Sequence, residues 1–286
     1  MRIGFIGLGQ MGRRMARRLP VAQTWVWNRT RETETALTKD GYGQVDDLSQ
    51  AVAQSEIVFT MLRDHEAVRQ VGQQGLFAGL GTRSAWVDLS TGSPEAGESF
   101  HALAVSQGAA FVAAPVLGTL APAEQGTLTV LAGGAPDDIA RVRGLLGRFG
   151  TVHHVGSVKD ALAAKLMVNT VLAYYMEAVS EVLVLADQEG LPRQAVLDLL
   201  QTSSVAAPVL RGKAERLIQG RYGQPDFPID LLAKDLDLMV GEADRAGVDL
   251  PGVTAVRGLV RTAASSAVHG DWDMAGVGEA LAKPRG

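Results

Sequence analysis

Cysteine is absent from the 286-residue sequence. Its absence excludes disulfide bridges, thiolate metal ligands and cysteine nucleophiles, and it is compatible with a reducing compartment. No two of the five histidines stand four residues apart, which is the spacing of a helical zinc site. The sequence also lacks the GxSxG turn of α/β-hydrolases and the GxxxxGKS/T loop of P-loop nucleotidases. We therefore expect no metal site and neither of these two enzyme classes.

The sequence carries little net charge and has no apolar run as long as a membrane span. The net charge is −4 and the isoelectric point is about 5.8, so nothing points to nucleic acid or an anionic membrane surface as a partner. The apolar run 166–176 contains Asn169 and is shorter than the roughly 20 residues of a membrane span. Glycines interrupt the apolar N-terminus, and no small-residue cleavage site follows it. We expect a soluble cytoplasmic protein without nucleic-acid or membrane partners.

The first half of the chain has the pattern of an α/β domain. Up to about residue 158, short apolar runs alternate with helix-like segments, as in a doubly wound parallel sheet covered by helices. One helix is predicted at Gln10–Leu19, and Ser93 with the proline after it marks the start of another. The predicted strands are Arg2–Ile6, Thr24–Trp27, Ile57–Thr60, Trp86–Leu89, Ala110–Val112, Leu128–Ala132 and Val152–Val155.

The second half contains helical patterns only. Ser157 can cap a long helix that Gly190 and Pro192 end. The predicted helices are Lys159–Gln188, Gln194–Thr202, Pro208–Gln219, Ile229–Ala246 and Gly252–Val268. We therefore predict an α/β domain over residues 1–158 and an all-helical domain over residues 159–286. The apolar character of 172–185 and 252–268 exceeds what a monomer needs, so we expect a homodimer or homotetramer.

A GxGxxG motif lies directly after the first predicted strand and opens a helix, which is the context of a Rossmann-type dinucleotide site. Gly7 can make the tight turn, and Gly9 lets a pyrophosphate approach the backbone. Gly12 allows the helix to pack closely on the strand. The predicted cofactor loop consists of Gly7, Leu8, Gly9, Gln10, Met11 and Gly12.

The second strand carries the signal for the type of dinucleotide. An NAD site has an acid about 20 residues after the first glycine, where it binds the ribose 2′-hydroxyl. Asn28 occupies this position, and Arg29 beside it can pair with a 2′-phosphate that a carboxylate would repel. We predict NADP(H) as the cofactor, bound by Asn28, Arg29 and Thr30. In the alternative interpretation, Arg29 and Arg31 only solvate a surface loop.

Four sequence blocks resemble the 3-hydroxyisobutyrate dehydrogenase family of β-hydroxyacid dehydrogenases, and they span nearly the whole chain. The blocks are GFIGLGQMG with WNRT, DLSTGSP, AAPVLGTLAPAEQGTLTVLAGG, and AAKLMVNT followed by LLAKDL. The resemblance implies a helical domain like that of 6-phosphogluconate dehydrogenase. It also implies an oxidoreductase that transfers hydride between NADP(H) and a short 3-hydroxyacid or its semialdehyde. A small carboxylate-bearing substrate is the implied partner.

The resemblance also implies site residues in the first domain. Ser90 and Thr91 follow a predicted strand and would line the junction of cofactor and substrate. Met61 and Leu62 follow the strand at Ile57–Thr60 and are predicted to bind the cofactor.

The family's substrate loop, DAPVSGG, corresponds to residues 113–119 of this chain. Leu117 replaces the family serine, Ala113 replaces the acid, and Thr119 replaces the second glycine. The backbone around Gly118 and Thr119 can still bind an anion. Leucine cannot make the serine's hydrogen bond, so the usual substrate is in doubt and a more apolar substituent is favoured.

Lys165 and Asn169 stand four residues apart and share one face of the long predicted helix. The apolar residues around them suggest a buried surface, and a lysine and an amide there need polar partners. A lysine whose pKa is lowered by burial can act as an acid or base near neutral pH. The resemblance assigns proton transfer to Lys165 and substrate orientation to Asn169. The alternative for Lys165 is a snorkelling side chain at a domain interface.

Lys234 and Asp235 lie in the predicted helix Ile229–Ala246. The resemblance places Lys234 against the cofactor and Asp235 in the substrate site, whereas the alternative is an exposed polar helix face.

Other activities stay open at this point. A glyoxylate or succinic semialdehyde reductase also resembles the WNRT and KLMVN segments. A 6-phosphogluconate dehydrogenase is disfavoured by Val168, where that enzyme has histidine, and an imine reductase is disfavoured by Lys165. A non-catalytic NADP-binding module would share the glycine motif but would not need Lys165 and Asn169.

Overall fold

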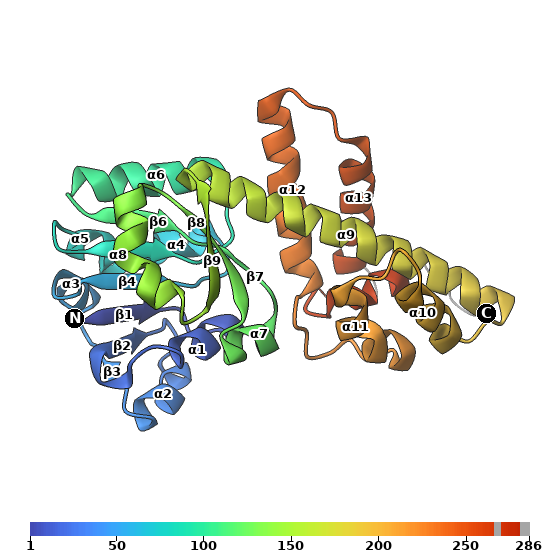
Figure 1. Cartoon of the computed structure of the whole chain (residues 1–286), viewed down its shortest axis with the longest axis horizontal. Helices are drawn as coiled ribbons and strands as arrows, with labels where there is room; N and C mark the ends of the chain where they lie inside the picture. The colour runs from blue at the N-terminus through green and yellow to red at the C-terminus, as the bar shows by residue number, and fades with distance from the viewer. Residues whose placement is uncertain (266–269, 281–286) are drawn as a thin grey trace. The chain divides into compact units, whose positions relative to one another are not determined.

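The computed structural model describes residues 1–265 and 270–280, and the chain divides into two compact units, Met1–Lys165 and Leu166–Gly286. The long helix α9 (Val158–Glu189) contributes to both units (Figure 1). The domain boundary predicted at residue 158 therefore coincides with the start of α9, whereas the division between compact units falls inside this helix.

The first unit is built on one mixed sheet. Its strands are β1 (Ile3–Ile6), β2 (Thr24–Trp27), β3 (Gly43–Gln44), β4 (Ile57–Thr60), β5 (Ala85–Asp88), β6 (Ala110–Ala113), β7 (Val116–Leu117), β8 (Leu128–Gly133) and β9 (Gly150–Gly156). Every predicted strand is present. The strands β3 and β7 were not predicted, because a two-residue strand has no periodic pattern that a sequence can reveal.

The strand order is β3-β2-β1-β4-β5-β6-β8-β7, with β9 paired to β8. The first six strands are parallel, in the order of a doubly wound Rossmann sheet, which confirms the predicted fold class. Beyond β6 the sheet departs from the predicted parallel arrangement, since β8 pairs antiparallel with β6 and β7. The short helix α7 (Leu120–Gln125) joins β7 to β8, and a connection this short permits only an antiparallel return.

Helices cover both faces of the sheet, because successive strand residues point to opposite sides. Phe5, Phe59 and Val87 belong to the core on one face, and their neighbours Val58 and Trp86 belong to the core on the other. The helical elements of this unit are α1 (Gln10–Ala16), α2 (Thr35–Lys39), α3 (Leu48–Ala53), α4 (His65–Val71), α5 (Phe77–Gly79), α6 (Pro94–Ser106), α7, α8 (Pro136–Leu146), and the short turns η1 (Val21–Gln23), η2 (Arg31–Thr33) and η3 (Gly72–Leu76).

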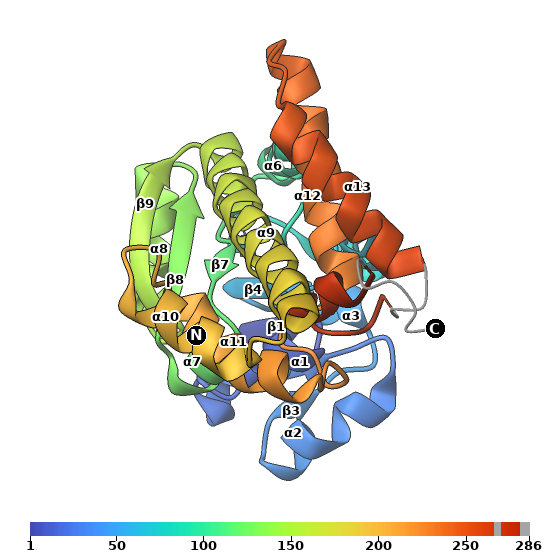
Figure 2. The ribbon, with the colours of Figure 1, turned by 90° about the vertical axis from the view of Figure 1, so that its right-hand side faces the viewer.

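The second unit is helical, as predicted. Its helices are the remainder of α9, α10 (Arg193–Thr202), α11 (Pro208–Gln219), α12 (Ile229–Ala246), α13 (Pro251–Ser265) and the 3₁₀ segment η4 (Met274–Ala280). Helices α12 and α13 lie side by side in both views (Figures 1 and 2). Residues 266–268 of the helix predicted at Gly252–Val268 lie outside the described residues.

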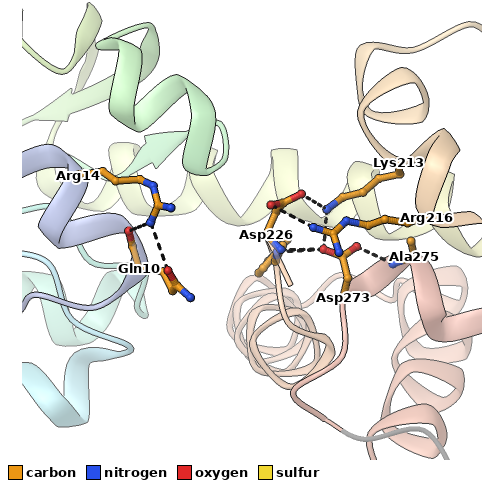
Figure 3. A network of polar contacts seen from close by, with 8 residues as sticks. Gln10, Arg14, Lys213, Arg216, Asp226, Asp273 and Ala275 are labelled. Carbon is orange, nitrogen blue, oxygen red and sulfur yellow. Dashed lines mark hydrogen bonds and ion pairs between the residues drawn. The ribbon is translucent and has the colours of Figure 1, made fainter. Parts of the chain in front are cut away.

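A buried ion cluster ties two loops to α11 in the second unit (Figure 3). Lys213 Nζ lies 3.0 Å from Asp226 Oδ2 and 2.6 Å from Asp273 Oδ2. Asp273 is fully buried, and its oxygens also accept hydrogen bonds from the backbone N–H groups of Asp226 and Ala275. Lys213 is therefore a structural lysine, because a buried charge is tolerated only when it is paired.

Within the described residues, α9 is the single helix long and apolar enough to span a membrane by length and composition. Length and composition do not distinguish a span from a long core helix. One side of α9 packs in the second unit's core through Ala173, Met176, Val179 and Leu183.

Candidate functional site

The glycine loop after β1 has the geometry that a dinucleotide pyrophosphate requires. Gly7 has φ +98°, and a Cβ there would lie 2.3 Å from the Met61 carbonyl oxygen. A Cβ on Gly12 would lie 1.9 Å from the Gly7 carbonyl oxygen, so α1 packs too closely for any side chain. A Cβ on Gly9 would meet nothing within 4 Å, which leaves open space for a ligand beside this backbone. The other loop positions are Leu8 (buried), Met11 (partly buried) and Gln10 (exposed).

Asn28, at the end of β2, holds the glycine loop by hydrogen bonds. Its Oδ1 accepts a hydrogen bond of 2.9 Å from Leu8 N, and its Nδ2 donates to the Thr30 carbonyl oxygen at 3.0 Å. Its backbone N–H donates to Oε1 of Glu34, a carboxylate that is only 1% exposed. An acid is therefore present near the end of β2, but it already accepts a hydrogen bond from the backbone of this turn.

The two arginines of this turn differ in their partners. Arg31 pairs with Asp46 at 2.8 Å, and this neighbour raises the pKa of its guanidinium further. Arg29 is exposed, and no hydrogen-bond or ion-pair partner stands beside it within residues 1–265 and 270–280. Arg29 is thus the arginine of the pair that can meet a phosphate without first breaking an ion pair.

The loops after β4 and β5 are joined by hydrogen bonds. Leu62 N donates to Ser90 Oγ at 3.0 Å, and Ser90 N donates to Asp88 Oδ1 at 3.1 Å. Ser90 is fully buried, so its hydroxyl orders these loops, whereas Met61 and Leu62 are partly exposed. All of these residues lie at the carboxyl ends of adjacent parallel strands, where open α/β sheets bind their ligands.

The predicted substrate contacts of the first unit lie on the loop after β5 and on β7. Thr91 is partly exposed and follows Ser90. Leu117 is half-buried and pairs with Thr129 of β8. Gly118 has φ +126°, a backbone conformation that glycine adopts without strain, and Thr119 precedes the first residue of α7. The loop therefore exposes backbone at Gly118.

Lys165 and Asn169 are buried on α9, with exposed fractions of 9% and 4%. Asn169 Nδ2 donates a 2.6 Å hydrogen bond to Asp235 Oδ2 on α12. The other oxygen of Asp235 lies 3.0 Å from Lys234 Nζ. The structure thus joins Asn169, Asp235 and Lys234, all predicted from the helical blocks, into one polar cluster.

The apolar neighbours of Lys165 do not all behave as their composition suggests. Leu166 is buried, but Met167, Val168 and Val171 are 56%, 45% and 67% exposed. The expectation of one buried apolar surface around Lys165 is therefore wrong for these three positions. The side of α9 that carries Lys165 and Asn169 is buried, so the apolar side chains on its other sides remain exposed.

The structure also buries polar groups that the sequence does not reveal as special. Glu177 is 5% exposed, and neither carboxylate oxygen has a hydrogen-bond partner within the described residues. Burial, with a smaller contribution from Glu181, raises the pKa of Glu177 to about 7. His65 Nε2 and Asp88 Oδ2 are also buried, 3.2 Å apart, although neither ring nitrogen of His65 has a hydrogen-bond partner within the described residues. Among residues 1–265 and 270–280, no group of three or more His, Asp or Glu side chains could hold a metal ion.

Comparisons with known proteins match both halves of the chain. Residues 2–158 match the family described as the NAD binding domain of 6-phosphogluconate dehydrogenase. Residues 160–281 match the family described as NAD-binding of NADP-dependent 3-hydroxyisobutyrate dehydrogenase.

Individual relatives cover almost the whole chain. Glyoxylate/succinic semialdehyde reductase 1 of Arabidopsis thaliana is 30% identical over 98% of both chains. The 3-hydroxyisobutyrate dehydrogenase of Mycobacterium tuberculosis, solved with L-serine, has a TM-score of 0.86 and 27% identity and covers 98% of this chain and 99% of its own. Psf3, solved with NADP+ and 2-OPP, has a TM-score of 0.87 and 26% identity over 98% of this chain and 100% of its own. With its glycine loop and its α9 and α12 blocks, the chain belongs to the β-hydroxyacid dehydrogenase family of NAD(P)-dependent oxidoreductases.

Proposed function

We propose that this protein is an NADP(H)-dependent oxidoreductase that interconverts a short hydroxyacid and the corresponding semialdehyde, with Lys165 as the proton-transferring residue. The observation that carries the proposal is the burial of Lys165 and Asn169, one helical turn apart on α9, with Asn169 hydrogen-bonded to Asp235. Burying a lysine and an amide costs free energy, so their presence on a packed helix face indicates a functional role.

The preference for NADP(H) is supported by Asn28 and Arg29. An amide at the end of β2 does not repel a 2′-phosphate, and the exposed Arg29 can pair with it. Glu34, the nearby acid, accepts hydrogen bonds from Asn28 N and Gln44 Nε2. It is thereby kept from serving as the acid that binds a ribose 2′-hydroxyl in an NAD site.

The chemistry assigned to the protein is proton transfer and orientation. When bound, the nicotinamide supplies or accepts the hydride. During reduction, Lys165 Nζ donates a proton to the substrate carbonyl oxygen, and during oxidation it takes the proton back from the hydroxyl. Asn169, held by its hydrogen bond to Asp235, orients the substrate.

The substrate class follows from the loop at residues 117–119. Backbone N–H groups around Gly118 can bind a carboxylate, and the half-buried Leu117 offers an apolar contact in place of a hydroxyl. We favour a 3-hydroxyacid and its semialdehyde. Reduction of glyoxylate or succinic semialdehyde is the second candidate, supported by the 30% identity with a reductase of that name over 98% of this chain.

The direct test is a substrate panel. Purified protein is mixed with NADPH or NADH and with glyoxylate, succinic semialdehyde or methylmalonate semialdehyde, and oxidation of the reduced cofactor is followed by absorbance. The reverse reaction is measured with 3-hydroxyisobutyrate and NADP+. Turnover with NADPH and at least one of these compounds is expected. NADPH binding without turnover on the entire panel would favour a non-catalytic sensor or interaction module.

Lys165 has a matched control on the same helix. Lys165→Ala should lower kcat by at least about 100-fold, the usual contribution of a general acid or base. Lys159→Ala removes an exposed lysine one residue into α9 and should leave kcat unchanged. Equal activities of the two variants would contradict the assignment of Lys165.

We also propose that the protein self-associates through α9. Four exposed apolar side chains of α9 lie on one side of the helix, because they are three, eight and three residues apart. They are Val171, Tyr174, Val182 and Leu185, here called the α9 stripe. A contiguous apolar stripe on a long helix is self-complementary in a twofold dimer.

A further inference from the structure

His65 and Asp88 form a buried pair beneath the loops that follow β4 and β5. His65 is the first residue of α4, and Asp88 is the last residue of β5. Their side chains are 7% and 2% exposed, and Nε2 of the histidine lies 3.2 Å from Oδ2 of the carboxylate. A buried carboxylate needs partners for both oxygens, so each contact of Asp88 matters for its surroundings.

The two oxygens of Asp88 have different partners. Oδ1 accepts hydrogen bonds from Thr60 Oγ1 at 2.7 Å and from Ser90 N at 3.1 Å. Oδ2 lies 3.2 Å from His65 Nε2, an ion-pair contact without hydrogen-bond geometry, and within residues 1–265 and 270–280 it has no other polar partner. Loss of the imidazole would remove this contact from a carboxylate whose side chain is only 2% exposed.

The loop after β5 rests directly on the imidazole ring. A Cβ on Gly92 would lie 2.1 Å from Cγ of His65, so glycine is required where the loop crosses the ring. The ring also packs edge-to-face against Phe100 of α6, with centroids 5.2 Å apart. His65 is thus held between α6 and the loop, with little freedom to move.

Asp88 is connected to the predicted cofactor residues by a continuous chain of hydrogen bonds. Asp88 accepts from Ser90 N, and Ser90 Oγ accepts from Leu62 N. The loops ordered in this way carry Met61, Leu62 and Thr91, which are among the residues predicted to contact the dinucleotide or the substrate.

We propose that His65 is a positioning residue: through Asp88 it orders the loops after β4 and β5, and thereby sets the affinity for the dinucleotide. The consequence for affinity rests on the proposed function, whereas the ordering of the loops does not. His65 contacts the loop after β5 directly at Gly92 and also reaches it through the carboxylate of Asp88, and a substitution that keeps the side chain's size but removes its N–H group tests the second route.

The test compares two substitutions that differ in a single property. His65→Gln keeps an N–H group that can reach Asp88, whereas His65→Leu fills the space without a donor. His101→Leu, at a partly buried histidine of α6, is the matched control. In the protein without cofactor, hydrogen exchange measured by mass spectrometry reports on the peptides that contain Leu62 and Ser90. NADPH titration then gives Kd for each variant.

His65→Leu should speed exchange in both peptides and weaken NADPH binding by about tenfold, because the Asp88 carboxylate loses its polar contact with the imidazole. His65→Gln should restore both quantities, and His101→Leu should change neither. Unchanged exchange in His65→Leu, or equal defects in the Leu and Gln variants, would overturn the proposal. If the unsubstituted protein does not bind NADPH, the proposed function fails, and the exchange data alone decide whether His65 orders the loops.

Discussion

Asn169 and Asp235, 66 residues apart in sequence, are joined by a hydrogen bond of 2.6 Å between two buried side chains. The bond connects α9 to α12 and fixes the orientation of the Asn169 amide, because its nitrogen is the donor. The carboxylate is also held by Lys234, so the pair carries one buried negative charge that is compensated.

A residue swap tests this pair. Asn169→Asp places two carboxylates within hydrogen-bond distance and should destabilise the second unit and abolish turnover. The double variant Asn169→Asp with Asp235→Asn restores one amide and one carboxylate, so it should recover most of the lost stability. Thermal unfolding followed by circular dichroism, with a double-mutant cycle, gives the coupling free energy. Additive losses in the double variant would show that the two side chains are not coupled.

The choice of dinucleotide is tested at Asn28. Asn28→Asp keeps the Oδ1 acceptor that receives the hydrogen bond from Leu8 N, but it adds a negative charge beside a bound 2′-phosphate. NADPH should bind at least about tenfold more weakly, because a repulsion of about 1.4 kcal/mol corresponds to that factor, while NADH binding should improve. Titration with both cofactors gives the ratio.

The two arginines provide the control for that experiment. Arg29→Ala should weaken NADPH binding and leave NADH binding unchanged, whereas Arg31→Ala, which removes a side chain already paired with Asp46, should affect neither. Equal effects of the two variants would mean that neither arginine recognises the 2′-phosphate and that both are only solvent-exposed residues of the turn.

The buried Glu177 predicts a pH dependence of stability. Its pKa is raised from 4.5 to about 7 in the folded protein, so between these values the folded state binds a proton that the unfolded state has lost. Stability is therefore fully present below about pH 4.5, decreases as pH rises to about 7 and stays reduced above that, by up to about 3 kcal/mol.

Glu177→Gln should remove this dependence, because a neutral amide has no charge to bury. The variant should have a higher Tm than the unsubstituted protein at about pH 8 and a similar Tm at about pH 4. Glu189→Gln, at the exposed end of α9, serves as the control and should leave the pH profile unchanged. A profile for Glu177→Gln identical to the original would remove Glu177 as the cause.

The α9 stripe predicts the behaviour in solution. Val171→Glu or Leu185→Glu places a charge in the proposed contact and should reduce the molar mass to that of one chain, as measured by light scattering. Gln188→Glu adds the same charge to an exposed polar position of the helix and should not change the mass. A monomer at all concentrations of the unsubstituted protein would rule out self-association.

Much of the fold follows from local sequence patterns. The helices Pro208–Gln219 and Ile229–Ala246 have the predicted bounds, because a proline or a periodic apolar face marks each start and a glycine with positive φ follows each end. The three glycines of the cofactor loop were also assignable, since the strand before them and the helix after them specify what each glycine must allow.

Other features depend on contacts between residues far apart in the chain. The partner of Asn169 and the pairing of Arg31 but not Arg29 are set by distant segments. The His65–Asp88 pair is of the same kind, although Asp88 stands in a recognisable sequence block.

The sequence by itself thus determined the doubly wound sheet, the helical second unit and the location of the glycine loop, since periodicity, caps and turns act over a few residues. The tertiary structure alone decided which polar groups are buried and paired, and which apolar side chains of α9 remain exposed. Burial and pairing depend on which segments meet in space, and no local pattern contains that information.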